Sequence, residues 1–176
     1  MPTFRFKELK PQIDPSVYIA PTSSIIGDVT IGKDSSVWFN CVIRGDDNAI
    51  IIGEETNIQD LTMLHSDFRK CLTLGNQVTI GHHCVLHGCT VEDECIIGMG
   101  AIVMAEAHVG RGSVVAAGSV VLENTAIPPF SLVAGAPGEV IRTCNEEVLD
   151  TNRRPARIYV RRARAYRDPT AIEMIE

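Results

Sequence analysis

The sequence predicts an all-β chain, a parallel β-helix of six-residue repeats that ends in a C-terminal α-helical segment. Three observations point to this fold. An aliphatic residue returns every six positions, and a small or β-branched residue usually stands two positions before it. Aromatic residues make up only 5% of the 176 residues, although 45% are hydrophobic. An excess of small branched side chains indicates a repetitive, strand-rich core.

The aliphatic series shows where the coils lie. A period of six fits neither an α-helix nor a long alternating strand, but it fits a short strand, a turn and another short strand. Three such units make one triangular coil of about 18 residues. A β-sandwich, the alternative, gives no reason for a fixed six-residue return. The series runs through Ile19, Ile25, Ile31, Val37, Ile43, Ile52, Ile58, Leu64, Leu74, Ile80, Leu86, Val91, Ile97, Val103, Val109, Val115 and Val121.

The repeat is interrupted three times and then stops. The register slips across Gly45–Ile51, takes a second insertion within Ser66–Thr73, and loses one residue before Val91. Each coil is held mainly by its neighbours, which lie ~4.8 Å away. The repeat ends near Pro128, and the segment SLVAGAPGEVIR is expected to close the last coil.

The composition changes at Asn145, which predicts a helical segment after the coils. Asn145 followed by two glutamates indicates a helix start, and Pro155 is expected to begin a second helix or kink the first. The chain is therefore divided into a β-helix domain, 1–144, and a C-terminal helix, 145–176, packed along it. The many arginines of this segment are interpreted as its solvated face.

Charge and cysteine usage exclude several classes of protein. The net charge of −6 argues against a nucleic-acid binder. No apolar run reaches the ~18 residues of a membrane span, and the N-terminal residues lack the apolar region of a secretory signal. We therefore expect a cytoplasmic protein that binds no membrane. The six cysteines form no CxxC pair, which predicts buried thiols rather than disulfides or a cysteine–zinc site.

The histidines point to a metal site. His65 follows Leu64, and His87 follows Leu86 one full coil later, so the two share one column. Their Cβ atoms should lie ~5 Å apart, close enough for both imidazoles to bind one ion. By the same count Arg44 lies one coil below His65. These alignments assume that the inserted residues bulge outward.

His82 is the third candidate ligand. It lies on the preceding face, near a corner, and would not easily reach an ion bound by His65 and His87 of its own chain. A neighbouring subunit is expected to supply it, which predicts a trimer with three equivalent sites. Three histidines with an open fourth position are typical of catalytic zinc. His83 is expected either to be exposed or to support a ligand without binding the ion itself, and His108 is expected to be structural.

The stretch RGDDNAIIIGEETNIQDLTMLH, followed by IGHHCVLHGC, resembles the γ-class carbonic anhydrases, in particular their bacterial branch without a long acidic loop. The repeat alone is shared with many acyltransferases. The resemblance covers most of the chain and implies a left-handed coil and a homotrimer. It also implies that His65 and His87 of one chain and His82 of the next bind the metal.

The same resemblance implies roles for five further residues. Arg44 and Asp46 would form an ion pair across the interface and position bicarbonate. Gln59 would orient the metal-bound water, Asp60 would support Arg44, and Asn57 would line the site. The alternative is that Arg44, Asp46 and Asp60 only lock the trimer, since a buried interface charge needs a partner.

The expected activity is reversible hydration of CO₂ to bicarbonate by a metal hydroxide bound to three histidines. Zn²⁺ is the expected ion, and Co²⁺ or Fe²⁺ also suit imidazole. Without the acidic loop, Asp67 or His83 would have to move the proton, and activity is expected to be weak. Two alternatives stay open: an acyl-CoA-dependent acyltransferase with His83 as general base, and a non-catalytic metal-binding trimer subunit.

Overall fold

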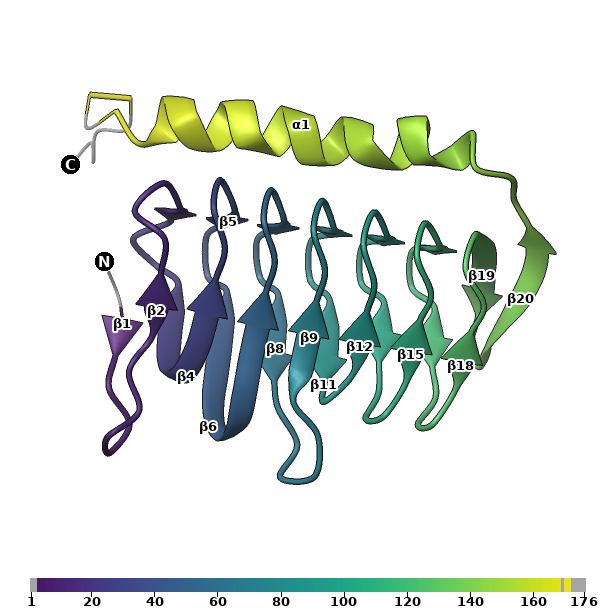
Figure 1. Cartoon of the computed structure of the whole chain (residues 1–176), viewed down its shortest axis with the longest axis horizontal. Helices are drawn as coiled ribbons and strands as arrows, with labels where there is room; N and C mark the ends of the chain where they lie inside the picture. Colours follow the sequence, from purple (N-terminus) through teal and green to yellow (C-terminus); the bar gives the residue numbers. More distant parts are fainter. Residues whose placement is uncertain (1–2, 169, 172–176) are drawn as a thin grey trace.

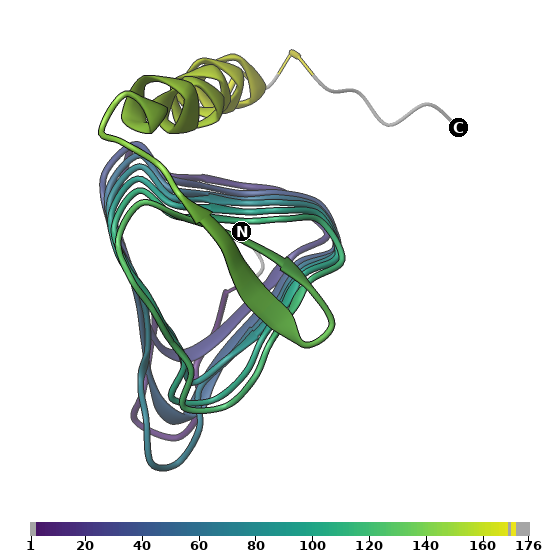
Figure 2. The same cartoon turned by 90° about the vertical axis from the view of Figure 1, so that its right-hand side faces the viewer.

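The computed structural model of the chain describes residues 3–168 and 170–171. It is a stack of triangular coils, with one long helix lying across the stack (Figures 1 and 2). Successive coils pair through parallel strands in two sheets. The predicted left-handed parallel β-helix of hexapeptide repeats with a C-terminal helix is confirmed.

Each coil has three sides, here called faces I, II and III in chain order from the strand that contains Ser24. Face I contains β1 (Thr3–Phe4), the first halves of β4 (Ser24–Ile31) and β6 (Val42–Ile52), β8 (Met63–His65), β11 (Val85–His87), β14 (Ile102–Val103) and β17 (Val120–Val121). Face II contains β2 (Gln12–Ile13), the second halves of β4 and β6, β9 (Leu72–Leu74), β12 (Thr90–Val91), β15 (His108–Val109) and β18 (Ala126–Ile127). Face III contains β3 (Tyr18–Ile19), β5 (Ser36–Val37), β7 (Asn57–Ile58), β10 (Thr79–Ile80), β13 (Ile96–Ile97), β16 (Val114–Val115) and β19 (Ser131–Gly135).

The last strand, β20 (Gly138–Thr143), turns back against β19. It pairs with β19 in the antiparallel direction, whereas every other named pair is parallel. The segment expected to close the last coil therefore does so as a hairpin that crosses the open end of the triangle (Figure 2).

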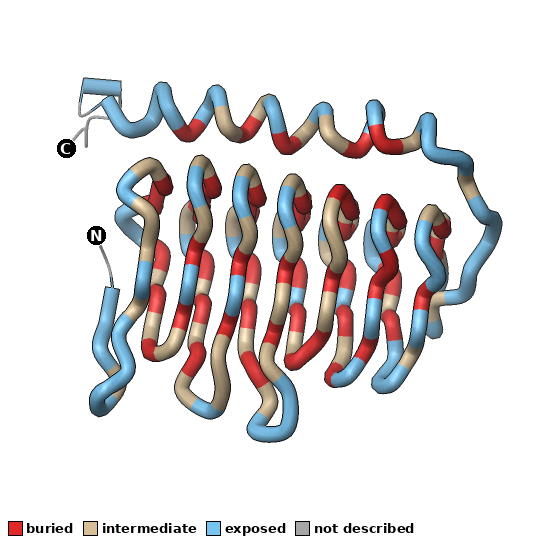
Figure 3. The backbone as a smooth tube through the Cα atoms, viewed as in Figure 1, coloured by how far each residue is buried: buried red, intermediate tan, exposed pale blue. Residues whose placement is uncertain are grey.

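The aliphatic series forms the core. Ile43, Leu64 and Leu86 are direct partners in successive coils, and all three are fully buried. Figure 3 shows buried residues recurring along the inner coils, whereas β1, β2 and β20 at the two ends are mostly exposed. Burying one such side chain stabilises the fold by ~1.5–3 kcal/mol. Each inward aliphatic side chain therefore packs on its counterpart in the next coil, and the same contact recurs along the axis of the stack.

The corners explain why the register can slip without loss of stacking. Most coils turn at a residue with positive φ, such as Leu61 and His83 between faces III and I. The residues inserted after Gly45 and Ser66 lie between faces I and II, and the strands on both sides keep their partners. The inserted residues thus bulge outward at one corner, as the alignment of successive repeats assumed.

Helix α1 (Val148–Tyr166) packs along face III and corrects two expectations. It begins at Val148 rather than Asn145, whose side-chain amide donates to Glu147 instead of capping the helix. Pro155 lies inside this one helix and begins no second one, while the alternative, a kink in the helix, stays a prediction. The proposed division after residue 144 falls between β20 and α1, and parts of both ranges lie outside the described residues. Among those described, no helix has the length and apolar character to cross a membrane.

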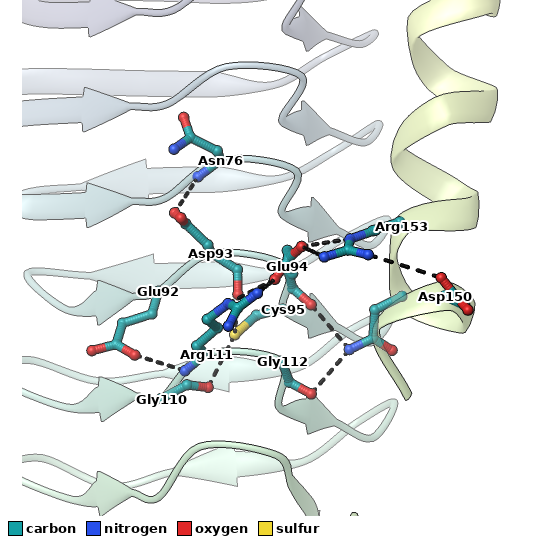
Figure 4. A network of polar contacts seen from close by, with 11 residues as sticks. Asn76, Glu92, Asp93, Glu94, Cys95, Gly110, Arg111, Gly112, Asp150 and Arg153 are labelled. Atoms are coloured by element: carbon teal, nitrogen blue, oxygen red, sulfur yellow. Dashed lines mark hydrogen bonds and ion pairs between the residues drawn. The ribbon is translucent and has the colours of Figure 1, made fainter. Parts of the chain in front are cut away.

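A buried carboxylate anchors the helix to the coils (Figure 4). Glu94, at a corner between faces II and III, pairs with Arg111 of the next coil and with Arg153 of α1. The side-chain amide of Asn152 donates to the backbone oxygens of Glu94 and Gly112, both at 3.0 Å. We call Glu94, Arg111, Asn152 and Arg153 the Glu94 cluster.

The cysteines give a first testable prediction. Burial raises the pKa of Cys41 and Cys84 to about 11 and that of Cys89 and Cys95 to about 12. Since the thiolate is the reactive form, a disulfide reagent at pH 8 should modify only Cys71 and Cys144 rapidly in the native protein. The four buried thiols should react only after denaturation, as read by mass spectrometry of the labelled peptides. Rapid labelling of Cys84 in the folded protein would contradict this prediction.

Candidate metal site

The structure places Arg44, His65 and His87 in one column on face I. Arg44 is the strand partner of His65, and His65 is the partner of His87. The two imidazole rings lie with their centroids 5.1 Å apart, and Nε2 of His87 is 3.1 Å from Nδ1 of His65. Two ring nitrogens therefore converge from adjacent coils.

Two carboxylates surround His65. Oδ1 of Asp46 lies 3.1 Å from Nε2 of His65, and Oδ2 of Asp47 lies 3.6 Å from the same nitrogen. Asp46 also accepts hydrogen bonds from Arg44, so this ion pair is formed within one chain. Partial burial opposes ionisation of Asp46, but the hydrogen bonds from Arg44 and His65 outweigh it and hold its pKa below the ordinary value.

This group fits a divalent ion. Two ligands ~2.05 Å from a tetrahedral zinc are ~3.3 Å apart, close to the 3.1 Å between the nitrogens of His87 and His65. Within the part of the chain that the structure describes, Asp46, Asp47 and His65 also bring one donor atom each within 4.8 Å of one another. These carboxylates lie beside Nε2 of His65, whereas His87 faces the other ring nitrogen, Nδ1. The nitrogen and carboxylate donors suit Zn²⁺, Co²⁺ or Fe²⁺. Arg44, Asp46, Asp47, His65 and His87 form what we call the first half-site.

His82 lies elsewhere on the same chain. It follows β10 at the corner between faces III and I, where its Nδ1 is 2.9 Å from Oδ2 of Asp60. The other oxygen of Asp60 accepts the backbone N–H of Phe39 at 3.2 Å. Within the chain Asp60 thus pairs with His82 and not with Arg44. A carboxylate on Nδ1 fixes the tautomer of the ring and leaves Nε2 as the metal-binding nitrogen.

Gln59 and Asn57 are held on face III beside this pair. Nε2 of Gln59 donates to Oδ1 of Asn57 at 3.0 Å, and Nδ2 of Asn57 donates to Oγ1 of Thr79 at 2.9 Å. Asn57 is fully buried, so its contact is with Gln59 rather than with open space. This chain orients the Gln59 amide, and its Oε1 accepts no hydrogen bond from the described residues. Asn57, Gln59, Asp60 and His82 form the second half-site.

The two half-sites occupy opposite edges of face I. The first lies where β8 and β11 end, and the second lies at the corner before they begin. One chain therefore brings together the expected residues in two groups and does not join them. Sequence reasoning missed Asp47, although the doubled aspartate after Gly45 was a visible signal. It also missed the aromatic residues around His82, which α1 contributes from far along the chain.

Gly45 lies between Arg44 and Asp46 for a steric reason. A Cβ at this position would overlap the carbonyl oxygen of Asp28 in the preceding coil. We expect Gly45→Ala to shift both charged neighbours and to weaken metal binding at least ~10-fold, as loss of supporting contacts does at other metal sites. Affinity is measured by competition with a chelator. The control is Gly118→Ala, where a Cβ meets nothing within 4 Å. It should cost ~1 kcal/mol of stability for its positive φ and leave metal affinity unchanged. Equal metal affinities in the two variants would contradict this account.

A stack of six-residue repeats with converging histidines at its corners defines a hexapeptide-repeat protein with a candidate metal site. The family model described as bacterial transferase hexapeptide (six repeats) matches residues 10–45 and 88–123. A solved structure described as a putative acetyltransferase from Bacillus cereus superposes with a TM-score of 0.91 at 40% identity, covering 93% of this chain and 95% of that one.

Similar proteins of known family identify a narrower group within the hexapeptide-repeat proteins. The chain is 39% identical to a carbonic anhydrase of Geobacillus kaustophilus, covering 93% of this chain and 90% of that protein. It is 44% identical to a probable carbonic anhydrase of Methanocaldococcus jannaschii, covering 85% and 94%. Gamma carbonic anhydrase 2, mitochondrial, of Arabidopsis thaliana is 41% identical, and the chain spans 63% of its length. The chain belongs to the γ-class carbonic anhydrase family.

Proposed function

We propose that the protein is a metal-dependent carbonate dehydratase, which interconverts CO₂ and bicarbonate at sites between the subunits of a homotrimer. His65 and His87 of one chain and His82 of the next would bind the ion. The observation that carries the proposal is the position of the two half-sites at opposite edges of face I. A neighbour that presents its His82 edge to the His65 edge completes the ligand set.

The surface between the half-sites supports this assembly. The outward residues of face I form an apolar ladder, Val42, Met63, Val85, Ile102 and Val120. Val85 is 40% exposed and Ile102 is 38% exposed in the single chain. The corresponding ladder of face II is mixed, with Ile51, which is 44% exposed, beside Thr73, Thr90 and His108. Exposed contiguous apolar surface marks an interaction site, and a head-to-tail contact that closes after three copies gives a ring.

The residues present support this chemistry. Three neutral histidines would hold the ion, which when bound would lower the pKa of a water from 15.7 towards ~7 and so supply the nucleophile for CO₂ at neutral pH. Asn57 and Thr79 orient the amide of Gln59. Its Oε1 would accept a hydrogen bond from the O–H of the nucleophile and so fix the direction of attack on CO₂. Asp60 holds His82 in the tautomer that binds through Nε2. The Arg44 guanidinium, beside Asp46, is the positive group available to bicarbonate.

The proton must then reach solvent. The backbone amide of Arg69 donates to Asp67 and holds the pKa of this carboxyl below its ordinary value, which makes Asp67 a weak base. His83, exposed at a corner one residue from His82, is the better candidate. We propose His83 as the group that passes the proton to buffer.

Mixing two inactive variants tests the shared site. Chains with His82→Ala and chains with His65→Ala each lack one ligand at every interface. In a mixed trimer one interface combines an intact His65 and His87 with an intact His82. We expect metal binding and CO₂ hydration to return at that interface only. No recovery in verified mixed trimers would overturn the shared site.

Metal content and hydration, measured together on the purified trimer, separate the alternatives. About one Zn, Co or Fe per chain with hydration supports the proposal. Stoichiometric metal without hydration favours a non-catalytic metal-binding trimer. Absence of metal, with no recovery on adding it, favours an acyl-CoA-dependent acyltransferase. The cytoplasmic location stays a prediction.

A further inference from the structure

In the single chain, a cavity of about 440 Å³ opens between the corner of the coils and helix α1, at the edge that the proposed trimer turns towards a neighbouring subunit. Its volume falls within the ~300–1,000 Å³ range of small-molecule sites and is far more than a triatomic substrate needs. The lining comprises Trp38, Phe39, Asp60, His82, Tyr159, Arg162 and Tyr166.

Aromatic rings form most of the wall. Tyr159 and Tyr166 pack edge-on against Trp38, with centroids 5.2 Å and 5.0 Å away, and Phe39 lies 6.4 Å from Tyr166. The only tryptophan and all three tyrosines of the sequence gather here, since Tyr18 also packs on Trp38. Rings held edge to face make a rigid wall on which another ring can stack.

One positive charge of the cavity has no acidic partner among the residues that the structure describes. The Asp60 carboxylate is engaged by His82 and by the backbone N–H of Phe39. Arg162 lies over the Tyr159 ring, 5.2 Å from its centroid, and forms no ion pair with any described residue. By contrast, Arg153 and Arg164 on the same helix pair with Glu94 and Asp34.

A buried hydroxyl also lacks a partner. The phenol oxygen of Tyr18 is buried and has no hydrogen bond within the described residues. Its ring touches the walls of the cavity, at centroid distances of 5.2 Å from Trp38 and 5.6 Å from Tyr166. Buried hydroxyls are nearly always hydrogen-bonded, but Tyr18 lies behind the wall and is not among the residues that line the cavity.

We propose that this cavity binds a small aromatic carboxylate. The ring lies against Phe39, Tyr159 and Tyr166, and the carboxylate binds the Arg162 guanidinium through paired hydrogen bonds. The ligand needs no metal for either contact, so the inference goes beyond the proposed hydration of CO₂. Because His82 lines the same cavity, a bound aromatic acid would lie at the edge of the proposed metal site.

Calorimetric titration of the chelator-treated chain of 176 residues tests the proposal, with benzoate as the probe. Acetate lacks the ring and benzyl alcohol lacks the charge. We expect saturable benzoate binding, with acetate and benzyl alcohol each bound at least ~10-fold more weakly. Arg162→Gln should weaken benzoate at least ~10-fold and leave benzyl alcohol nearly unchanged. Tyr166→Leu should weaken benzoate and benzyl alcohol alike.

Arg161→Gln is the matched control, because Arg161 is an exposed neighbour on the same helix and lines a different groove. It should leave benzoate binding unchanged. An equal loss of benzoate affinity in both arginine variants would show that benzoate is attracted to the basic helix in general, and it would overturn the proposal. Binding only to metal-loaded protein would place benzoate on the ion and overturn it too. Benzoate binding without CO₂ hydration would count against the proposed function and leave this inference standing.

Discussion

Replacing His87 with alanine is expected to remove most of the bound metal and to lower kcat/KM for CO₂ hydration at least ~100-fold. His87 supplies one of two ring nitrogens that converge at 3.1 Å, and no other described histidine lies in this column above His65. Elemental analysis of the purified protein and a stopped-flow pH-indicator assay measure the two quantities.

His108→Ala is the matched histidine control. His108 lies on face II, half exposed and paired with Glu92 at 2.8 Å. Its removal should change neither metal content nor rate by more than about twofold, since exposed pairs contribute little. If the His87→Ala protein kept its full metal content and full activity, His87 would not be a metal ligand.

The second large effect is expected at Glu94. Glu94→Ala leaves Arg153 and Arg111 without the carboxylate they share, and Glu94 is only 8% exposed. Breaking a buried ion pair costs ~3–5 kcal/mol, and the partial exposure of both arginines lowers the expected loss to about 2–3 kcal/mol. Urea denaturation followed by circular dichroism measures the change in the free energy of unfolding.

The neighbouring Glu92→Ala is the control, because its side chain is 41% exposed and it pairs with exposed His108. We expect a loss below ~1 kcal/mol. If Glu94→Ala is no more destabilising than Glu92→Ala, the Glu94 cluster does not anchor the helix.

The repeat made much of the fold predictable. Six-residue spacing identifies the inward residues one by one, and the column of Arg44, His65 and His87 follows by counting coils. The end of the chain was harder, because local signals conflict there. Asn145 favours a cap, yet its amide bonds to Glu147, and Pro155 is tolerated within the helix.

The candidate site was predictable only where it follows the repeat. The pairing of Asp60 with His82 depends on side-chain directions at a corner, which spacing does not specify. The contacts of Tyr159 and Tyr166 with Trp38 join residues more than a hundred positions apart. No period links the helix to the coils, so these walls of the cavity became visible only in three dimensions.

The path of α1 has a consequence for how the molecule unfolds. A stack of coils alone is a linear array in which each unit senses only its neighbours, so its ends can fray independently. Here the helix leaves the last coil and runs back to the first (Figure 1), where Arg167 donates to the backbone oxygen of Ser16, 151 residues earlier in sequence. Helix α1 thus connects both ends of the stack. Unfolding of either terminal coil therefore removes contacts from α1, the helix that the other coils also contact. This shared helix couples the coils into a single cooperative unfolding transition.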